Sequence, residues 1–423
     1  MLWDIIEGAD RAALACRAQD FTRSGPLSLS VMVALLLFLV ADAGRRGYAL
    51  LLEAFWGAAK GARLELPRRE PVSAAAFCLA RQKLRAEGVR ELVWRSAERF
   101  EHEWGEGFRW RGRRVFAVDG SRVDLQRAEA LWQRYGAATG GGCPQATLST
   151  LFDLVSKVPH DVCVAPFGAD ERGLLLEEHL DRLCPGDLLV LDRGYPSYSV
   201  LHELLARGVD FAVRVPTRSG FPAVARFVDS GKRNAQIEIA VPWGYGCRDA
   251  APLSVRAVRL PGPDAEPMVV LTSLPLRGFG WRVIRELYRM RWGIESYYDV
   301  VKGDYFGQRQ FHAKSPVGVE QEIYAQALLV SLTRHLMAAA AKRQGVPYEH
   351  LRDKRAILAV AEALTRLLLT RRPRDAHALL NDILRRIARR PVPPRPDRSY
   401  ERRSFKPGSK WHAHGRRGRP RLA

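Results

Sequence analysis

The chain has 423 residues, too many for one compact hydrophobic core, so its length predicts two or three domains. A hydrophobic content of 47% excludes a wholly disordered protein. The formal net charge of +21 favours a polyanionic partner over a basic protein whose charge serves only solubility.

Cysteine usage indicates neither a zinc site nor a disulfide framework. The cysteines are far apart and form no CxxC pair and no Cys/His cluster. They are Cys16, Cys78, Cys143, Cys163, Cys184 and Cys247. We therefore expect reduced thiols and a cytoplasmic protein.

Residues 1–105 are expected to be helical. Their most apolar run, residues 31–41, is shorter than the roughly 20 residues of a membrane span, which favours a buried helix over a signal or anchor segment. Candidate caps flank this run, with Ser28 or Ser30 before it and Gly44 or Gly47 after it.

A second helical pattern spans residues 71–100 and carries several cations among its apolar residues. They are Arg81, Lys83, Arg85 and Arg90. Two interpretations stay open: the helix lies along DNA, or it packs on the core and turns a solvated basic face outward.

From Arg113 the pattern changes to short apolar strands that alternate with helices, which predicts an α/β layer with some parallel pairing. Strands are expected at residues 113–120, 146–155, 160–167, 187–195 and 209–215, and helices at 168–183 and 197–208. The first strand is expected to end abruptly in Asp119 and Gly120, and the fourth in Asp192, Arg193 and Gly194. Sites in such layers form where strands end, so both aspartates are candidate site residues. Two other acids near strand ends, Asp153 and Asp161, are interpreted as turn or structural residues.

Residues 216–275 are expected to form an all-β insertion, because strand patterns alternate there with Gly/Pro-rich connectors. The expected strands lie at residues 235–241, 253–260 and 267–274. The chain then returns to helical patterns as far as about residue 390.

Residues 391–423 form a basic tail that is expected to be disordered. Its first residues are rich in proline, which excludes helix, and residues 395–423 contribute a net charge of +8. The RRGRPR sequence at residues 416–421 either reads a narrow minor groove or tethers the chain to phosphates without specificity.

The stretch Leu287–Asp304 predicts an amphipathic helix with an unusually mixed polar face. At about 100° per residue, Arg291, Glu295 and Lys302 fall at about 300°, 340° and 320° from Tyr288. The apolar residues fall between about 180° and 280° on the same count, as in a helix packed on a core. The polar face is either a set of surface ion pairs or a catalytic face, with a carboxylate for a metal and cations for phosphate.

Asp119, Asp192 and Glu295 together supply the three carboxylates of a two-metal site. Two divalent ions about 3.5–4 Å apart activate a nucleophile and stabilise the leaving oxygen of a phosphodiester displacement. Carboxylates suit Mg²⁺ or Mn²⁺. By spacing alone, Asp299 is an equal candidate for the third acid. Trp292 is expected to be buried rather than free to stack on a base.

Three blocks of the sequence resemble the signature of the DDE transposases of the insertion-sequence family numbered four. They are VDGS at 118–121, LDRGY at 191–195, and Tyr288, Arg291, Glu295 and Lys302 at spacings of three, four and seven. The third block is the specific one. The resemblance spans about residues 70–310 and includes AAAFCLARQKL at residues 74–84.

This resemblance implies an α/β protein with a ribonuclease-H-like catalytic core and a β-rich insertion, flanked by N-terminal and C-terminal helical regions. The implied order is a DNA-binding region at 1–105, the first part of the core at 106–215, the insertion at 216–275, the catalytic helix and a helical region at 276–390, and the tail at 391–423. It implies cleavage at transposon ends and strand transfer into target DNA, with a hairpin intermediate in some members.

The resemblance also assigns roles by position. The implied catalytic metal ligands for Mg²⁺ or Mn²⁺ are Asp119, Asp192 and Glu295. The implied DNA contacts are Tyr288, Arg291 and Lys302, with Arg193 a further candidate beside Asp192. The implied partners are double-stranded DNA, as inverted repeats and as target, and a second copy of the chain in a synaptic homodimer, at the bacterial nucleoid and without a membrane.

Two rival interpretations stay open. A non-enzymatic or inactivated DNA-binding derivative would bind DNA in a salt-sensitive way without cleaving it. A nuclease or resolvase on the same core would nick DNA without joining it to a target.

Overall fold

The computed structural model describes residues 11–393, with the exception of residues 24, 43–45, 62–65, 67, 219, 244–245, 247–250, 263–266, 303–310 and 371. The predictions made for Gly44, for Cys247 and for the tail beyond residue 393 fall outside the described residues.

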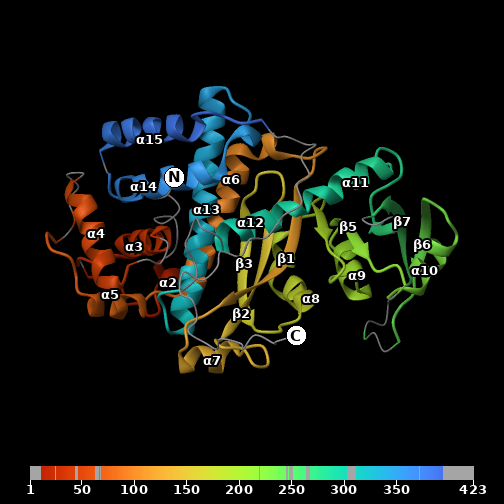
Figure 1. Cartoon of the computed structure of the whole chain (residues 1–423), viewed down its shortest axis with the longest axis horizontal. Coiled ribbons are helices and arrows are strands. Elements are labelled where there is room, and N and C mark those ends of the chain that lie inside the picture. Colours follow the sequence, from red (N-terminus) through yellow and green to blue (C-terminus); the bar gives the residue numbers. More distant parts are fainter. Residues whose placement is uncertain are drawn as a thin grey trace, which may run out of the picture.

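A mixed eight-stranded sheet runs through the described part of the chain, in the order β3-β2-β1-β4-β5-β8-β7-β6 (Figure 1). The strands are β1 Val115–Asp124, β2 Gln145–Asp153, β3 Pro159–Pro166, β4 Leu188–Leu191, β5 Asp210–Val215, β6 Asn234–Ile239, β7 Leu253–Pro261 and β8 Pro267–Thr272. Strands β1, β2 and β3 pair antiparallel, whereas β4 and β5 run parallel to β1. The predicted α/β fold class is confirmed, and the sheet is consistent with a ribonuclease-H-like core.

Helices surround the sheet on both faces. The helices that precede β2 are α2 Arg11–Leu14, α3 Leu29–Ala41, α4 Tyr48–Gly61, α5 Ala74–Arg81, α6 Ala86–Trp104 and α7 Glu129–Tyr135. Those that follow are α8 Glu171–Leu174, α9 Tyr198–Ala206, α10 Pro222–Asp229, α11 Trp281–Met290, α12 Trp292–Lys302, α13 Pro316–Gln344, α14 Asp353–Leu369 and α15 Pro373–Ala388.

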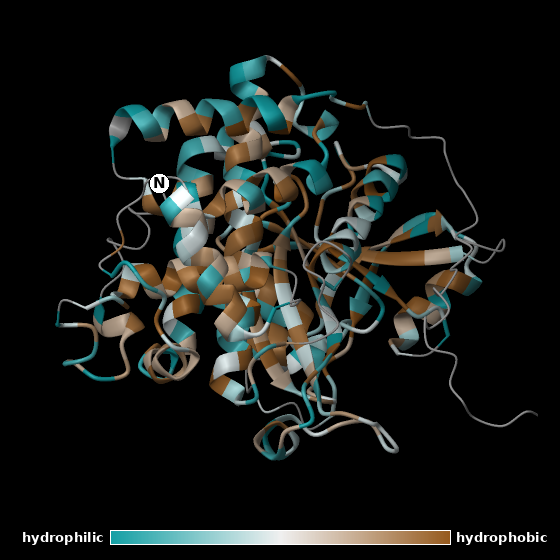
Figure 2. Ribbon diagram, turned by 60° about the vertical axis from the view of Figure 1, so that its left-hand side comes forward, coloured by the Kyte–Doolittle hydropathy of each residue, from teal (hydrophilic) through white to brown (hydrophobic). Residues whose placement is uncertain are grey.

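The two faces of the sheet bury separate cores, because successive side chains of a strand point to opposite faces. In β1, Val115 and Ala117 join the core beneath α11, α12 and α13. Phe116 and Val118 join the core that α9 and α10 cover. Figure 2 shows the apolar strands enclosed by helices whose outer faces are largely hydrophilic.

The predicted insertion strands are confirmed, but the region is not all-β. Helix α10 lies within it and buries Ala223, Val224 and Phe227. Strand β8 also pairs with β5 of the core, so β6, β7 and β8 extend the central sheet instead of forming a separate one.

Helix α3 is the predicted buried helix. Its residues 31–37 are all buried, and the Ser28 side chain accepts a hydrogen bond from the backbone N–H of Val31, which confirms one of the two predicted caps. Within the described ranges, no helix combines the length and the apolar character that crossing a membrane requires.

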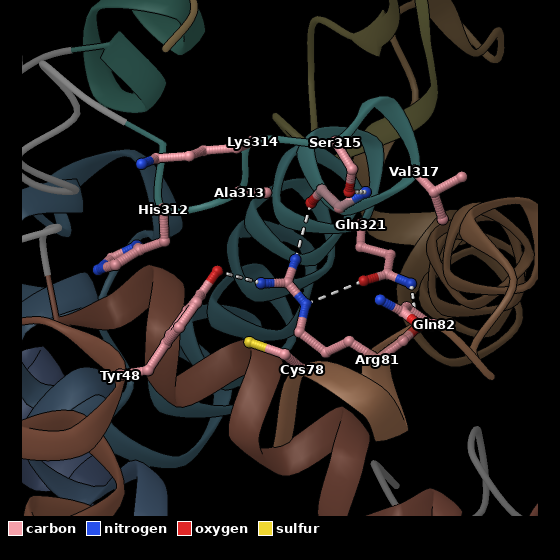
Figure 3. A pocket seen from close by; sticks show the side chains of 11 residues that line it. Tyr48, Cys78, Arg81, Gln82, His312, Ala313, Lys314, Ser315, Val317 and Gln321 are labelled. Atoms are coloured by element: carbon pink, nitrogen blue, oxygen red, sulfur yellow. Dashed lines mark hydrogen bonds between the residues drawn. The ribbon is translucent and has the colours of Figure 1, made fainter. Parts of the chain in front are cut away.

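Arg81 joins the N-terminal helices to α13, and Figure 3 shows it among the residues that line a cavity of about 590 Å³. Its guanidinium donates to Gln321 Oε1 at 3.0 Å, to Glu322 Oε1 at 3.0 Å and to Gly318 O at 2.8 Å. Arg90 also turns inward, where it pairs with the buried Asp161. Of the four cations in the helical pattern at residues 71–100, Lys83 and Arg85 are exposed. Arg81 and Arg90 have structural roles.

Arg81→Ala is expected to lower the free energy of unfolding by about 3–5 kcal/mol, because it leaves the buried Glu322 carboxylate without its cation. Urea unfolding followed by circular dichroism measures the change. The control is Lys83→Ala, which removes an exposed cation two residues away and is expected to change stability by less than about 0.5 kcal/mol. Equal stability of the two variants would contradict the structural role of Arg81.

Candidate active site

The register of the sheet brings Asp119 and Asp192 to the same level. Strand β4 pairs with β1 from Val115 opposite Leu188 to Ala117 opposite Val190, so two further steps set the aspartates side by side on neighbouring strands. The predicted end of β1 in Asp119 and Gly120 is wrong, because the strand continues to Asp124 along β2. It is β4 that stops, at Leu191, and this opens a notch in the sheet beside Asp119.

The predicted single helix over residues 287–304 is also wrong. The chain forms α11 and α12, with Arg291 at the break, where its N–H bonds to Tyr288 O in a tighter turn. Gly293 follows the break, and a Cβ at this position would lie 3.3 Å from Leu154 Cδ2. Its missing side chain therefore lets α12 begin close against the sheet.

Tyr288 and Arg214 hold Asp192. The Tyr288 hydroxyl donates to Asp192 Oδ1 at 3.0 Å, and Arg214 Nη1 lies 3.8 Å from the same oxygen. Burial acts to raise the pKa of Asp192, but the backbone N–H of Arg193, the charge of Arg291 and the Tyr288 hydroxyl outweigh burial and lower it. Asp192 is therefore held as a carboxylate.

Arg291 is the central cation of the site. Its side chain is buried, and Nη2 donates to Glu295 Oε1 at 2.6 Å. Burial acts to lower its pKa, but Asp192, Tyr288 and Glu295 outweigh this and raise it. The same guanidinium lowers the pKa of both aspartates. Arg291 therefore interacts with three carboxylates, those of Asp119, Asp192 and Glu295.

Two side chains in the C-terminal half of α12, those of Tyr298 and Lys302, hold β1 by hydrogen bonds. The Tyr298 hydroxyl donates to Asp119 O at 2.7 Å, and its oxygen lies 3.1 Å from the Thr150 hydroxyl, which can donate to it. Lys302 Nζ donates to Ser121 Oγ, two residues beyond Asp119. Burial lowers the pKa of Lys302, an effect that nearby carboxylates partly offset.

The Asp119 carboxyl is only partly satisfied. It accepts a hydrogen bond from the Gly120 N–H at 3.0 Å. Burial raises its pKa to about 6, and the carboxylates of Glu171 and Glu295 reinforce this rise while Arg291 opposes it. The notch therefore carries more negative charge than its one buried guanidinium neutralises.

Glu171 is a fourth acid at this place, and sequence reasoning missed it. It begins α8, and its carboxylate lies against Gly120, where a Cβ would come within 2.8 Å of Glu171 Cδ. It also approaches Gly194, two residues after Asp192. Burial raises the pKa of Glu171, reinforced by Asp170 and Asp192 and opposed by Arg122. No sequence signal marked it, because no strand ends there.

The remaining candidates lie around the notch. Arg193 and Asp299 are both exposed. Trp292 was expected to be buried but is 58% exposed, because it begins α12 on its outer side. Asp153 accepts hydrogen bonds from Val155 and Ser156 in a turn, as interpreted from the sequence.

A buried polar chain lies behind α8. Ser149 Oγ is 3.0 Å from His179 Nε2, and His179 Nδ1 is 2.7 Å from Asp161 Oδ2. The three side chains are fully buried, so no substrate reaches them. Arg90 completes the set by forking onto Asp161 at 2.8 and 2.7 Å, and the chain anchors the π-helical turn Leu175–His179 that follows α8.

The chemistry of these acids suits a hard divalent cation, since each donor is a carboxylate oxygen and Gly120 leaves space where a Cβ would intrude. In the arrangement of the described residues, however, no three His, Cys, Asp or Glu side chains converge as a metal site. The reason is local: Glu295 is turned onto Arg291, and Asp192 onto Tyr288.

Residues 110–332, more than half of the chain, match the family model described as "Transposase DDE domain". Among solved structures, a cryo-EM structure of the piggyBac transposase synaptic complex with hairpin DNA is similar, with a TM-score of 0.47 and 10% sequence identity. That likeness covers 96% of this chain and 87% of the other. No curated protein sequence matches the chain.

Asp119→Asn is expected to stabilise the metal-free protein at alkaline pH. The protonated carboxyl favours folding below its ordinary pKa of 3.8, and this contribution is lost as the pH rises through the folded pKa of about 6. The neutral amide avoids that loss, so the free energy of unfolding in EDTA should rise by about 2 kcal/mol at pH 8 and by about half as much at pH 5. Asp299→Asn is the matched control, and a gain independent of pH would contradict this account.

Proposed function

The chain belongs to the transposase DDE-domain family, and on that premise we propose that it cuts DNA at the ends of a mobile element and joins the freed 3′-ends to target DNA. The observation that supports this most directly is the gathering of Asp119, Asp192 and Glu295 around Arg291 at the notch beside β4. We propose these three carboxylates as the catalytic metal ligands.

The proposed finer family is the insertion-sequence family numbered four. It is supported by the third block, because the four residues of this block lie close together at the notch. Tyr288 and Arg291 hold Asp192 and Glu295, and Lys302 lies beside Asp119 through Ser121.

Divalent ions such as Mg²⁺ or Mn²⁺, held by the three carboxylates, would activate the attacking oxygen and stabilise the leaving oxygen of the phosphodiester. The residues of the chain position the DNA for this displacement. Arg291 and Lys302 supply positive charge on the two sides of Asp119, where phosphate oxygens must approach. The Tyr288 hydroxyl orients Asp192 and helps the Arg193 N–H and Arg291 to keep it ionised.

The DNA path is proposed to follow the outer side of α11. Arg282, Arg285 and Arg289 are exposed there at spacings of three and four, which places them on one face of the helix. This basic stripe leads toward Arg291 and the notch. Arg193 and the exposed Trp292 lie at the same end and are proposed as further DNA contacts.

The proposed partners are double-stranded DNA, as inverted repeats and as target, and a second copy of the chain, because two ends must be brought together. The proposed place of action is the bacterial nucleoid.

Cleavage is expected to depend on each of the three acids. Asp119→Asn, Asp192→Asn and Glu295→Gln should each slow cleavage of a fragment carrying the inverted repeats that flank the reading frame, with Mg²⁺ or Mn²⁺, by roughly 100-fold or more. Asp299→Asn, one turn after Glu295 and exposed, should leave the rate within about twofold. Gel analysis of cleaved and joined products measures both steps.

The same gel separates the rival functions. Cleaved ends without joined products would indicate a nuclease or resolvase. Binding without any cleavage by the wild-type chain would indicate a non-enzymatic DNA-binding protein, and undiminished cleavage by the three variants would remove their catalytic assignment.

The basic tail is expected to tether the chain to DNA without specificity. A chain ending at Pro393 lacks the net +8 of residues 395–423, so the slope of log affinity against log salt should become shallower by up to about 7 units. Fluorescence anisotropy on DNA of random sequence, from 50 to 300 mM salt, measures the slope. Full-length Asp119→Asn keeps the tail and serves as the control, and equal slopes for the truncated and full chains would refute the tether.

A further inference from the structure

Glu171 reaches the notch from the face of the sheet opposite to Glu295. Side chains of β1 alternate, so Asp119 shares a face with Ala117 and α12, whereas Gly120 shares the other with Val118. Glu171 lies on the Gly120 side, where the glycine leaves room for its carboxylate. Because β4 has already ended, no strand separates this carboxylate from the strand-end aspartates.

The Glu171 carboxylate has no hydrogen-bond or ion-pair partner among the described residues, although it is half-buried and near two other acids. A partly desolvated carboxylate without a donor is unfavourable, and its repulsion from Asp119 and Asp192 adds to that cost, which the charge of Arg122 offsets only in part. A bound cation relieves both penalties.

The backbone around Glu171 is firmly held. Asp170 caps α8 by accepting hydrogen bonds from the N–H groups of Arg172 and Gly173. The Arg172 side chain donates to Gly194 O at 2.8 Å, which fixes α8 to the loop that follows Asp192. At the other end, His179 is bonded to the buried Asp161. Glu171 is therefore kept at the notch by contacts that do not use its own carboxylate.

We propose that Glu171 is a fourth carboxylate ligand of the divalent-cation site formed by Asp119, Asp192 and Glu295. This inference rests on the proposed function of the site. The cation would then have carboxylate ligands from both faces of the sheet, Glu295 from α12 and Glu171 from α8. Six-coordinate oxygen sites of Mg²⁺ and Mn²⁺ accommodate such an additional ligand, directly or through a bound water.

The test is Mn²⁺ binding by the full chain, followed through the electron paramagnetic resonance signal of free Mn²⁺. Glu171→Gln is expected to raise the Kd for Mn²⁺ by about 10-fold or more, since losing even a group that only supports a metal ligand typically weakens binding by about 10- to 100-fold. Glu177→Gln is the matched control, an exposed acid on the following turn, and should bind as the wild type does. Thermal unfolding in EDTA should give Glu171→Gln a midpoint at least as high as that of Glu177→Gln, because the amide removes a half-buried carboxylate without a partner, and this separates weaker metal binding from a loss of folding.

A second pair of variants tests the position of the carboxylate. Gly120→Ala places a methyl group against Glu171, so it should weaken Mn²⁺ binding in the wild-type background. In a Glu171→Ala background the same change should have little further effect, because the displaced group is gone. Equal effects in both backgrounds would overturn the proposed contact.

Failure of this inference and failure of the proposed function give different results. If Asp119→Asn abolishes Mn²⁺ binding while Glu171→Gln binds as the wild type does, Glu171 is not a ligand and the three-acid site stands. If the wild-type chain binds no Mn²⁺ with or without DNA ends, both the metal site and the fourth ligand are overturned.

Discussion

The candidate site depends on a difference in length between two neighbouring strands. β4 is four residues long and β1 is ten, so β1 loses its parallel neighbour just after Ala117. The Tyr298 hydroxyl donates to Asp119 O on the β2 side of β1 and lies 3.1 Å from Thr150 Oγ1 of β2, which ties α12 to both strands where the carboxylate emerges. A longer β4 would continue alongside β1 beyond Ala117 and close the notch.

Charge is the second constraint on the site. Burying several carboxylates together is unfavourable unless cations or hydrogen bonds offset the loss of solvation. Arg291 does so in part, while Asp119 keeps a pKa raised to about 6 and Glu171 has no partner in the described structure. The site therefore stores unfavourable energy that a tighter ion-pair network would remove. Local destabilisation of this kind is common at functional sites, because side chains that already have all their hydrogen-bond and ion-pair partners cannot bind a ligand.

Sequence reasoning predicted the strands well, since apolar runs are local signals, and it named three acids whose catalytic role stays a prediction. It failed where the structure depends on a contact with a segment that is distant in the sequence. The end of β1 was placed at Asp119 because the apolar pattern stops there, yet pairing with β2 carries the strand to Asp124. The break at Arg291 follows from packing of Gly293 on Leu154, which no helical periodicity reveals. Glu171 was missed because only the folded sheet brings α8 to Gly120.

Two clusters of titratable groups in this fold differ in whether they still have a free acceptor and access to a ligand. Ser149, His179 and Asp161 form a hydrogen-bonded series whose order resembles that of a hydrolase triad. Asp161 also binds Arg90 and is fully buried, so the series has neither a free acceptor nor a path to substrate. At the notch the reverse holds, because the acids there are partly exposed and Glu171 accepts nothing among the described residues. The first cluster holds α8 in place, and that rigidity is what allows the second to keep an unsatisfied carboxylate where a cation can reach it.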